Sequence, residues 1–249
     1  MAQNSSGEAE QAVVIGANGG IGNAVLRHWS GDERFDRVWA VSRNGVDAQE
    51  LPRSVCQSLT TYHDPAHIRD LAEQICSESP RLSRVVIALG TLHGKDYEPE
   101  KSLEALDPRV MQEVYRVNCV LPMLWLAALA RGLRKNPDCR IAMLSARVGS
   151  IEDNHLGGWY SYRSAKAGLN MGMRSAAIEL SRRAKGVKLL AFHPGTVDTP
   201  LSAPFQRSVP DEKLFSAGFV AEQLDGILNE YEADGELSYL DWAGKPIPW

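Results

Sequence analysis

The 249-residue sequence predicts an α/β protein with a doubly wound parallel sheet and helices on both of its faces. Short β-branched and apolar runs alternate with helical patterns along the chain, and a glycine-rich loop separates the first run from the first helix. No Ser/Gly/Pro-rich linker or internal repeat divides the chain. We therefore expect a single domain over residues 11–249, preceded by a disordered polar extension over residues 1–10.

The first half of the chain opens with an apolar strand that runs into the glycine loop. Its second helix has a clear start, because Asp64 can cap the first turn and Pro65 suits the first helical position. The predicted elements are, in order, a strand at 12–15, a helix at 21–29, strands at 37–41 and 55–60, a helix at 65–76 and a strand at 85–89.

The second half opens with a long helix that starts in the same way, at Asp107 and Pro108. Its apolar run from Val120 to Ala130 is shorter than the roughly 18 residues that a membrane span needs, so we interpret it as a buried helix. The predicted elements are a helix at 107–133, a strand at 140–144, a helix at 162–185 stopped by Gly186, a strand at 188–192, a loop with short helical turns at 199–216, a helix at 219–229 and a strand at 237–241.

The composition argues against several classes of partner. The formal net charge is −4 and no basic run is present, so we expect neither nucleic acid nor a membrane as a partner. The cysteines at 56, 76, 119 and 139 form no C-x-x-C pair, which favours a reducing, cytoplasmic location. His63 and His67 are spaced like metal ligands on a helix but have no evident third ligand, so we expect no metal site.

The glycine loop at residues 16–22 (GANGGIG) predicts a site for a dinucleotide. Glycines at such a strand–helix turn let the backbone approach a pyrophosphate, and the helix that follows offers free N–H groups and the positive end of its dipole. The loop follows an N-terminal buried strand, which is the context that a dinucleotide site requires.

The end of the second predicted strand indicates which dinucleotide is bound. An acidic residue there would bind the ribose 2′-hydroxyl of NAD and repel a 2′-phosphate, but this strand ends in Ser42 and Arg43. The planar guanidinium of Arg43 could pair with a phosphate. We therefore predict NADP(H) rather than NAD(H), the alternative being that Arg43 is a solvated surface residue.

Tyr162 and Lys166 are four residues apart in a predicted helix, so they share one helix face. A phenol with a pKa near 10 is a poor acid–base group at neutral pH, but a nearby ammonium favours the phenolate. Such a tyrosine could donate a proton to a carbonyl oxygen or accept one from an alcohol. The pair by itself could equally be an ordinary helix-face pair.

In combination, these motifs resemble the short-chain dehydrogenase/reductase superfamily over nearly the whole chain, which implies a Rossmann-like fold. The loop matches the family pattern T-G-x-x-x-G-x-G except that Ile15 replaces the threonine, and residues 162–166 match Y-x-x-x-K. Asn118 falls where the family carries its catalytic asparagine, and residues 194–199 (PGTVDT) match the proline–glycine motif beside the nicotinamide. The segments 149–163 and 241–249 resemble the C-factor-like branch, which is related to carbonyl reductases.

The resemblance implies a role for each matching residue. Tyr162 is expected to be the general acid or base, and Lys166 to lower its pKa and hold the nicotinamide ribose. Asn118 is expected to support a water that links Lys166 to solvent, and Ser145 to hydrogen-bond the substrate oxygen. The positions expected to contact the cofactor are Gly16, Asn18, Gly20, Ile21, Gly22, Ser42, Arg43, Thr61, Gly90, Tyr162, Lys166, Pro194, Gly195, Val197 and Thr199.

The sequence departs from the family pattern at the catalytic serine. An ungapped alignment on Gly149 places Ala146 at that position, so Ser145 can serve only if the strand end shifts by one residue, and Ser150 is a second candidate. The family's N-N-A-G motif is also reduced to residues 87–90 (IALG), and its adenine-contacting Asp falls near Thr61.

The resemblance implies an NADP-dependent oxidoreductase, similar to carbonyl reductases, that transfers a hydride between NADP(H) and a carbonyl or alcohol group of a small organic substrate. The alternative is an NADP(H)-binding sensor or signalling protein with little or no turnover, which the missing serine would favour. By analogy with the family, a homodimer or homotetramer is expected. An apolar lid is predicted from Leu201, Pro204, Phe205 and Leu214, which favours hydrophobic aldehydes, ketones or quinones as substrates.

Overall fold

The computed structural model describes residues 9–46, 51, 55–59, 64–135 and 138–249. Its core is one parallel sheet with the strand order β3-β2-β1-β4-β5-β6-β9. This is the doubly wound, Rossmann-like arrangement that the alternation of strands and helices predicts. The strands are β1 (Glu10–Ile15), β2 (Phe35–Ser42), β3 (Val55–Leu59), β4 (Leu82–Ile87), β5 (Cys139–Leu144), β6 (Val187–His193) and β9 (Leu237–Asp241).

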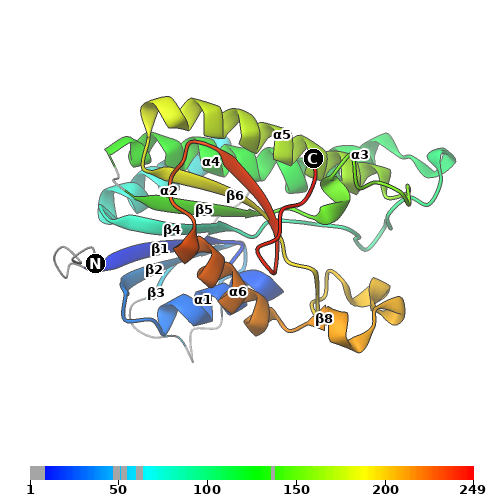
Figure 1. Ribbon diagram of the computed structural model, residues 1–249, viewed down its shortest axis with the longest axis horizontal. Helices are drawn as coiled ribbons and strands as arrows, with labels where there is room; N and C mark the ends of the chain where they lie inside the picture. The colour runs from blue at the N-terminus through cyan, green and yellow to red at the C-terminus, as the bar shows by residue number, and fades with distance from the viewer. Residues whose placement is uncertain (1–8, 47–50, 52–54, 60–63, 136–137) are drawn as a thin grey trace.

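Helices cover both faces of the sheet (Figure 1). One face carries α2 (Pro65–Glu78), α4 (Leu121–Gly132) and α5 (Tyr160–Arg183), and the other carries α1 (Gly20–Ser30) and α6 (Ala217–Glu230). The strands alternate between two cores, so that Ile141 of β5 faces the α4–α5 side while Ala142 faces the α1–α6 side. The single-domain α/β fold is confirmed.

The predicted long helix consists of three parts. α3 (Pro108–Tyr115) leads into a π-helical turn at Arg116–Val120, which continues directly into α4. The whole run Pro108–Gly132 is long and apolar enough, by length and composition alone, to cross a membrane. In this structure it packs as a core helix, because Trp125 and Leu129 are completely buried beside the sheet.

Local sequence signals place the helix starts correctly and one helix end wrongly. Asp64 and Asp107 both cap their helices, accepting hydrogen bonds from Ala66 N at 2.8 Å and from Arg109 N at 2.8 Å. The prediction that Gly186 stops the long helix is wrong: α5 ends at Arg183 with Ala184 as its cap, since the chain turns there to enter β6. β1 begins at Glu10, inside the extension expected over residues 1–10.

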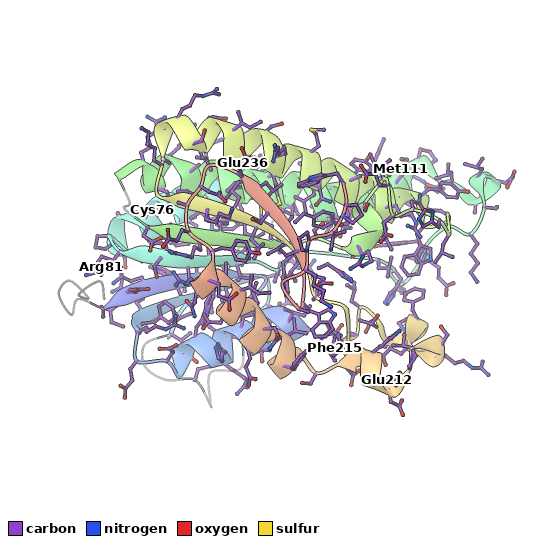
Figure 2. All side chains as sticks on the ribbon, viewed as in Figure 1. Cys76, Arg81, Met111, Glu212, Phe215 and Glu236 are labelled. Atoms are coloured by element: carbon purple, nitrogen blue, oxygen red, sulfur yellow. The ribbon has the colours of Figure 1, made fainter. Side chains whose placement is uncertain are left out.

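The segment after β6 forms a projecting lid, here the lid segment (residues 196–215). It contains β7 (Thr196–Val197), the short helices η5 (Ala203–Ser208) and η6 (Asp211–Lys213), and β8 (Leu214–Phe215), and β7 pairs with β8. Phe215 lies where this segment rejoins the body of the molecule (Figure 2), and its ring packs against Trp242 at 4.4 Å. The predicted loop with short helical turns therefore packs, at its end, against the residue that follows β9.

Candidate active site

Three glycines of the loop between β1 and α1 have no room for a side chain. Gly16 has φ +89°, and a Cβ there would lie 2.7 Å from Ala88 O, while one at Gly22 would lie 2.2 Å from Gly16 O. A Cβ at Gly20 would lie 2.4 Å from Cγ2 of Thr199, so the lid segment crosses directly over the loop. The N-cap of α1 is Gly19, which has no side chain to cap the helix, so the first N–H groups of α1 are available to an anion.

A continuous cleft runs along the carboxyl ends of the strands, where open α/β sheets bind ligands. A cavity of about 230 Å³ lies between the glycine loop, Arg43 and the turn after β4. A second, of about 140 Å³, shares Gly19 and Gly90 with the first and reaches Tyr162 and Lys166. A third, of about 550 Å³, adjoins the second at Tyr162 and opens under the lid segment, with mostly apolar walls.

Tyr162 and Lys166 meet where the second and third cavities join. Both are buried on α5, and Lys166 Nζ lies 5.7 Å from the centroid of the Tyr162 ring and donates to Leu144 O at 2.7 Å. Burial lowers the pKa of Lys166 to about 7. Burial, with a smaller contribution from Tyr239, raises the pKa of Tyr162 above its ordinary value. Lys166 does not contribute to this shift, and its expected effect on the pKa of Tyr162 stays a prediction.

Asn118 occupies the π-helical turn, a feature that often marks functional sites. Its Nδ2 donates to Thr91 O at 2.7 Å and to Val114 O at 2.9 Å, and its Oδ1 accepts from Thr91 N at 3.2 Å. A Cβ at Gly90 would lie 3.2 Å from Asn118 Oδ1 and 3.8 Å from Lys166 Nζ. Because Gly90 has no side chain, Asn118 and Lys166 can both lie close to it.

The two candidate serines have different surroundings, and a catalytic role for either one stays a prediction. β5 and β6 pair in continuous register up to Leu144, and Ser145 follows directly at the end of the strand. Ser145 contributes to the cleft lining, but its hydroxyl donates to Asn170 Oδ1 at 2.6 Å. Ser150 lines a separate depression, and its Oγ accepts from Asp153 N at 3.0 Å. Ala146 packs beside Tyr162, so a methyl group stands where the family pattern has a hydroxyl.

The predicted cofactor positions gather along the cleft. Thr61 lies outside the described residues, and Ser42 is completely buried beside Arg43, with an Oγ that has no partner among the described residues. The others line one or more of the three cavities: Gly16, Asn18, Gly20, Ile21, Gly22, Arg43, Gly90, Tyr162, Lys166, Pro194, Gly195, Val197 and Thr199. The crowded glycines, the uncapped α1 and the position of Arg43 fit a phosphate-bearing dinucleotide.

Several cleft residues were not found from the sequence. Arg116 lines the first cavity, as Arg43 does, and pairs with Glu113 at 2.7 Å. His193 and Arg147 line the third cavity beside Tyr162. Burial, reinforced by Arg147, lowers the pKa of His193 to about 4, so this ring is neutral at pH 7. The sequence gives little sign of these residues, because each reaches the cleft only through the strand order and the helix packing.

Within the described part of the chain, no group of three or more His, Cys, Asp or Glu side chains is arranged to hold a metal ion.

The doubly wound sheet, the glycine loop and the buried tyrosine–lysine pair in one cleft define a dinucleotide-dependent oxidoreductase of the hydride-transferring class. Residues 10–209 match the short chain dehydrogenase family, and the chain belongs to that family. This confirms the resemblance seen in the motifs.

Curated relatives and solved structures agree with this assignment. The C-signal protein of Myxococcus xanthus is 31% identical over 149 residues, which cover 59% of this chain and 84% of that protein. The 1-hydroxy-2-glutathionyl-2-methyl-3-butene dehydrogenase of Rhodococcus sp. (strain AD45) is 26% identical over 239 residues, covering 95% and 98%. The crystal structure of an NADPH-bound carbonyl reductase from chicken fatty liver superposes with a TM-score of 0.80 at 24% identity, covering 97% of this chain and 100% of that one. At this identity the structural likeness establishes the shared fold.

Proposed function

We propose that this protein is an NADP(H)-dependent reductase or dehydrogenase that transfers a hydride between the cofactor and a carbonyl or alcohol group of a small organic substrate. One observation carries the proposal. Tyr162 lies where the second cavity joins the apolar third cavity of about 550 Å³, Lys166 lines the second cavity beside it, and the buried Asn118 lies next to Gly90. A carbonyl group bound there would have an acid–base group on one side and the nicotinamide site on the other.

Residues of this protein would donate the proton to the substrate and replace it afterwards. NADPH, when bound, supplies the hydride. The Tyr162 hydroxyl donates its proton to the carbonyl oxygen as the C–H bond forms, and the product is an alcohol. A lysine whose pKa is about 7 gains and loses protons readily near neutral pH, so Lys166 is suited to reprotonate Tyr162. Asn118 would support a water that connects Lys166 with solvent.

The preference for NADP(H) rests on the first cavity. Arg43, at the end of β2, and Arg116, in the π-helical turn, both line it, and β2 ends without the carboxylate that would bind an unphosphorylated ribose. Two guanidinium groups can form charge-assisted bonds to a 2′-phosphate. In line with this preference, the structurally similar carbonyl reductase from chicken fatty liver binds NADPH.

The test is NADPH oxidation, followed by absorbance, against a panel of hydrophobic aldehydes, ketones and quinones. Wild-type protein should turn over at least one of them, and Tyr162→Phe should abolish turnover while NADPH binding persists. If Tyr162→Phe retained full activity, the proposed acid–base role would be refuted.

A second candidate function is an NADP(H)-dependent sensor with little turnover. The observation that favours it is Ala146, which packs beside Tyr162 where the family pattern has a serine, and one relative is named for a signal rather than an enzyme. Tight NADPH binding with no turnover on the panel would favour the sensor, whereas turnover on any of its carbonyl compounds would favour the reductase.

Self-association is proposed as well. Val120 in the π-helical turn and Met171 and Ile178 on α5 are exposed apolar side chains, and Met171 is 68% exposed. These residues support a homodimer or homotetramer that covers this surface. Light scattering coupled to gel filtration should give the mass of a dimer or tetramer, and a monomer would exclude the proposal.

A further inference from the structure

The residue at the amino end of α5 has an unusual backbone conformation. Trp159 has φ 51° and ψ 41°, and it is the only non-glycine residue with a positive φ in the described part of the chain. Bulky side chains rarely adopt this left-handed region, so such a conformation persists only where surrounding contacts enforce it. Gly157 and Gly158 before it also have positive φ, so the chain makes a left-handed turn directly into the helix that carries Tyr162.

Glu100, from a distant part of the chain, holds this turn in place. Its backbone carbonyl accepts from Trp159 N at 2.6 Å. Glu100 is buried, with only 5% of the residue exposed. Its carboxylate accepts a hydrogen bond from Ser161 N at 3.2 Å and another from the Ser161 hydroxyl. The carboxylate lies at the positive end of the α5 dipole and satisfies the Ser161 N–H, one of the first N–H groups of the helix, which have no partner within the helix. Glu100 is thus the cap that α5 lacks in its own sequence.

The left-handed turn places the Trp159 ring beside the rings of Tyr162 and Phe205 in the wall of the third cavity. Its centroid lies 6.4 Å from that of Tyr162, with the planes at 77°, and 5.1 Å from that of Phe205 in the lid segment. All three rings line the third cavity. The wall beside the proposed catalytic hydroxyl is therefore aromatic, and it spans from α5 to the lid.

We propose that Trp159, held in place by Glu100, is the specificity-determining residue of this cavity and gives it a preference for carbonyl compounds that carry an aromatic ring on the carbonyl carbon. This inference rests on the proposed reductase function. A carbonyl oxygen at the Tyr162 hydroxyl leaves its substituent beside the indole. Aromatic rings attract one another edge-to-face or offset at centroid distances of roughly 4.5–7 Å, an interaction that a saturated ring of similar size does not make.

The test compares benzaldehyde with cyclohexanecarbaldehyde, which differ mainly in aromaticity. Trp159→Leu should lower kcat/KM for benzaldehyde about two- to tenfold more than for cyclohexanecarbaldehyde, whereas Trp159→Phe should keep most of the preference. Phe219→Leu, an equivalent change outside the cavity, should leave the ratio of the two kcat/KM values unchanged. Equal losses on both substrates in Trp159→Leu would overturn the inference.

Two further variants separate specificity from folding. Glycine adopts positive φ without steric hindrance, so Trp159→Gly should fold and lose the aromatic preference as Trp159→Leu does. Glu100→Gln weakens the cap. It should reduce the ratio of kcat/KM for benzaldehyde to kcat/KM for cyclohexanecarbaldehyde, to a value between those of the wild type and Trp159→Leu. If Glu100→Gln lowers the melting temperature but leaves the ratio unchanged, Glu100 is only a helix cap and its positioning role is refuted.

Binding of unreactive analogues distinguishes failure of the inference from failure of the proposed function. Benzamide and cyclohexanecarboxamide can be titrated calorimetrically into the NADP⁺-loaded protein. Tighter binding of benzamide in the wild type, lost in Trp159→Leu, would support the inference even if neither aldehyde were reduced, in which case only the reductase function would fail. Equal affinities in the wild type would refute the aromatic preference whether or not the protein turned over.

Discussion

Ala146→Ser is expected to increase turnover. Ala146 packs beside Tyr162 in the cavity where the family pattern has a serine, and its backbone is extended (φ −154°, ψ 144°), a conformation that serine adopts freely. The side chain needs room for one additional oxygen, and the adjoining cavity of about 550 Å³ provides it. The substitution would therefore add a second hydrogen-bond donor for the substrate oxygen without overpacking.

The size of the effect follows from the charge on that oxygen. A hydrogen bond to a charged group contributes about 1.5–3 kcal/mol. If the bond forms mainly in the transition state, where negative charge develops on the oxygen, kcat should rise about ten- to hundredfold. The opposing possibility comes from the position of residue 146 as the N-cap of the short helix Arg147–Gly149, since the introduced hydroxyl could bond to a backbone N–H of that helix.

The assay is steady-state NADPH oxidation on the best substrate from the panel, with melting temperatures measured in parallel. A kcat that is unchanged or lower in a stably folded Ala146→Ser protein would refute the reasoning. Ser145→Ala is the companion variant: it removes the 2.6 Å bond to Asn170 and should lower the free energy of unfolding by about 1 kcal/mol. If Ser145→Ala instead impaired kcat as severely as Tyr162→Phe, Ser145 would be the catalytic hydroxyl after all.

Three other variants test the cleft. Because burial lowers the folded-state pKa of Lys166 to about 7, its destabilising effect grows as pH falls from about 10 to 7 and is constant below. Lys166→Met should abolish turnover yet raise the free energy of unfolding of the cofactor-free protein by about 3–5 kcal/mol at pH 7; urea denaturation should show a smaller gain at pH 9. Arg43→Ala should weaken NADPH binding about tenfold and leave NADH binding nearly unchanged, as fluorescence titration would reveal. Gly22→Ala, whose Cβ would lie 2.2 Å from Gly16 O, should abolish NADPH binding and destabilise the fold, whereas Gly226→Ala, with open space around it on α6, should bind normally and melt no lower than the wild type.

Much of the cofactor cleft could be predicted because its determinants are local. The glycine loop follows directly on a buried strand, Arg43 directly follows β2, and Tyr162 and Lys166 are one helical turn apart. The spacing of such residues in the sequence translates into spacing in the fold without knowledge of the tertiary structure.

The serine and the cavity wall could not be predicted in the same way. Whether Ser145 or Ala146 faces Tyr162 depends on the register of β5 at its last residue, and two neighbouring residues that differ by one hydroxyl offer no sequence signal to decide it. Glu100 caps a helix that begins 60 residues later, so the contact exists only once the fold brings the two segments together. The left-handed conformation of Trp159 contradicts the ordinary preference of its residue type.

The π-helical turn at Arg116–Val120 has an evolutionary consequence. A π-turn contains one residue more than the α-helix it interrupts, so losing one residue from it would leave a regular helix. α4 is fixed in the core by Trp125 and Leu129, so the rotation, about 100° for one residue, would fall on the residues before α4 and break the hydrogen bonds of Asn118 to Thr91. Among homologues, a one-residue deletion here should therefore occur together with loss of the tyrosine–lysine chemistry.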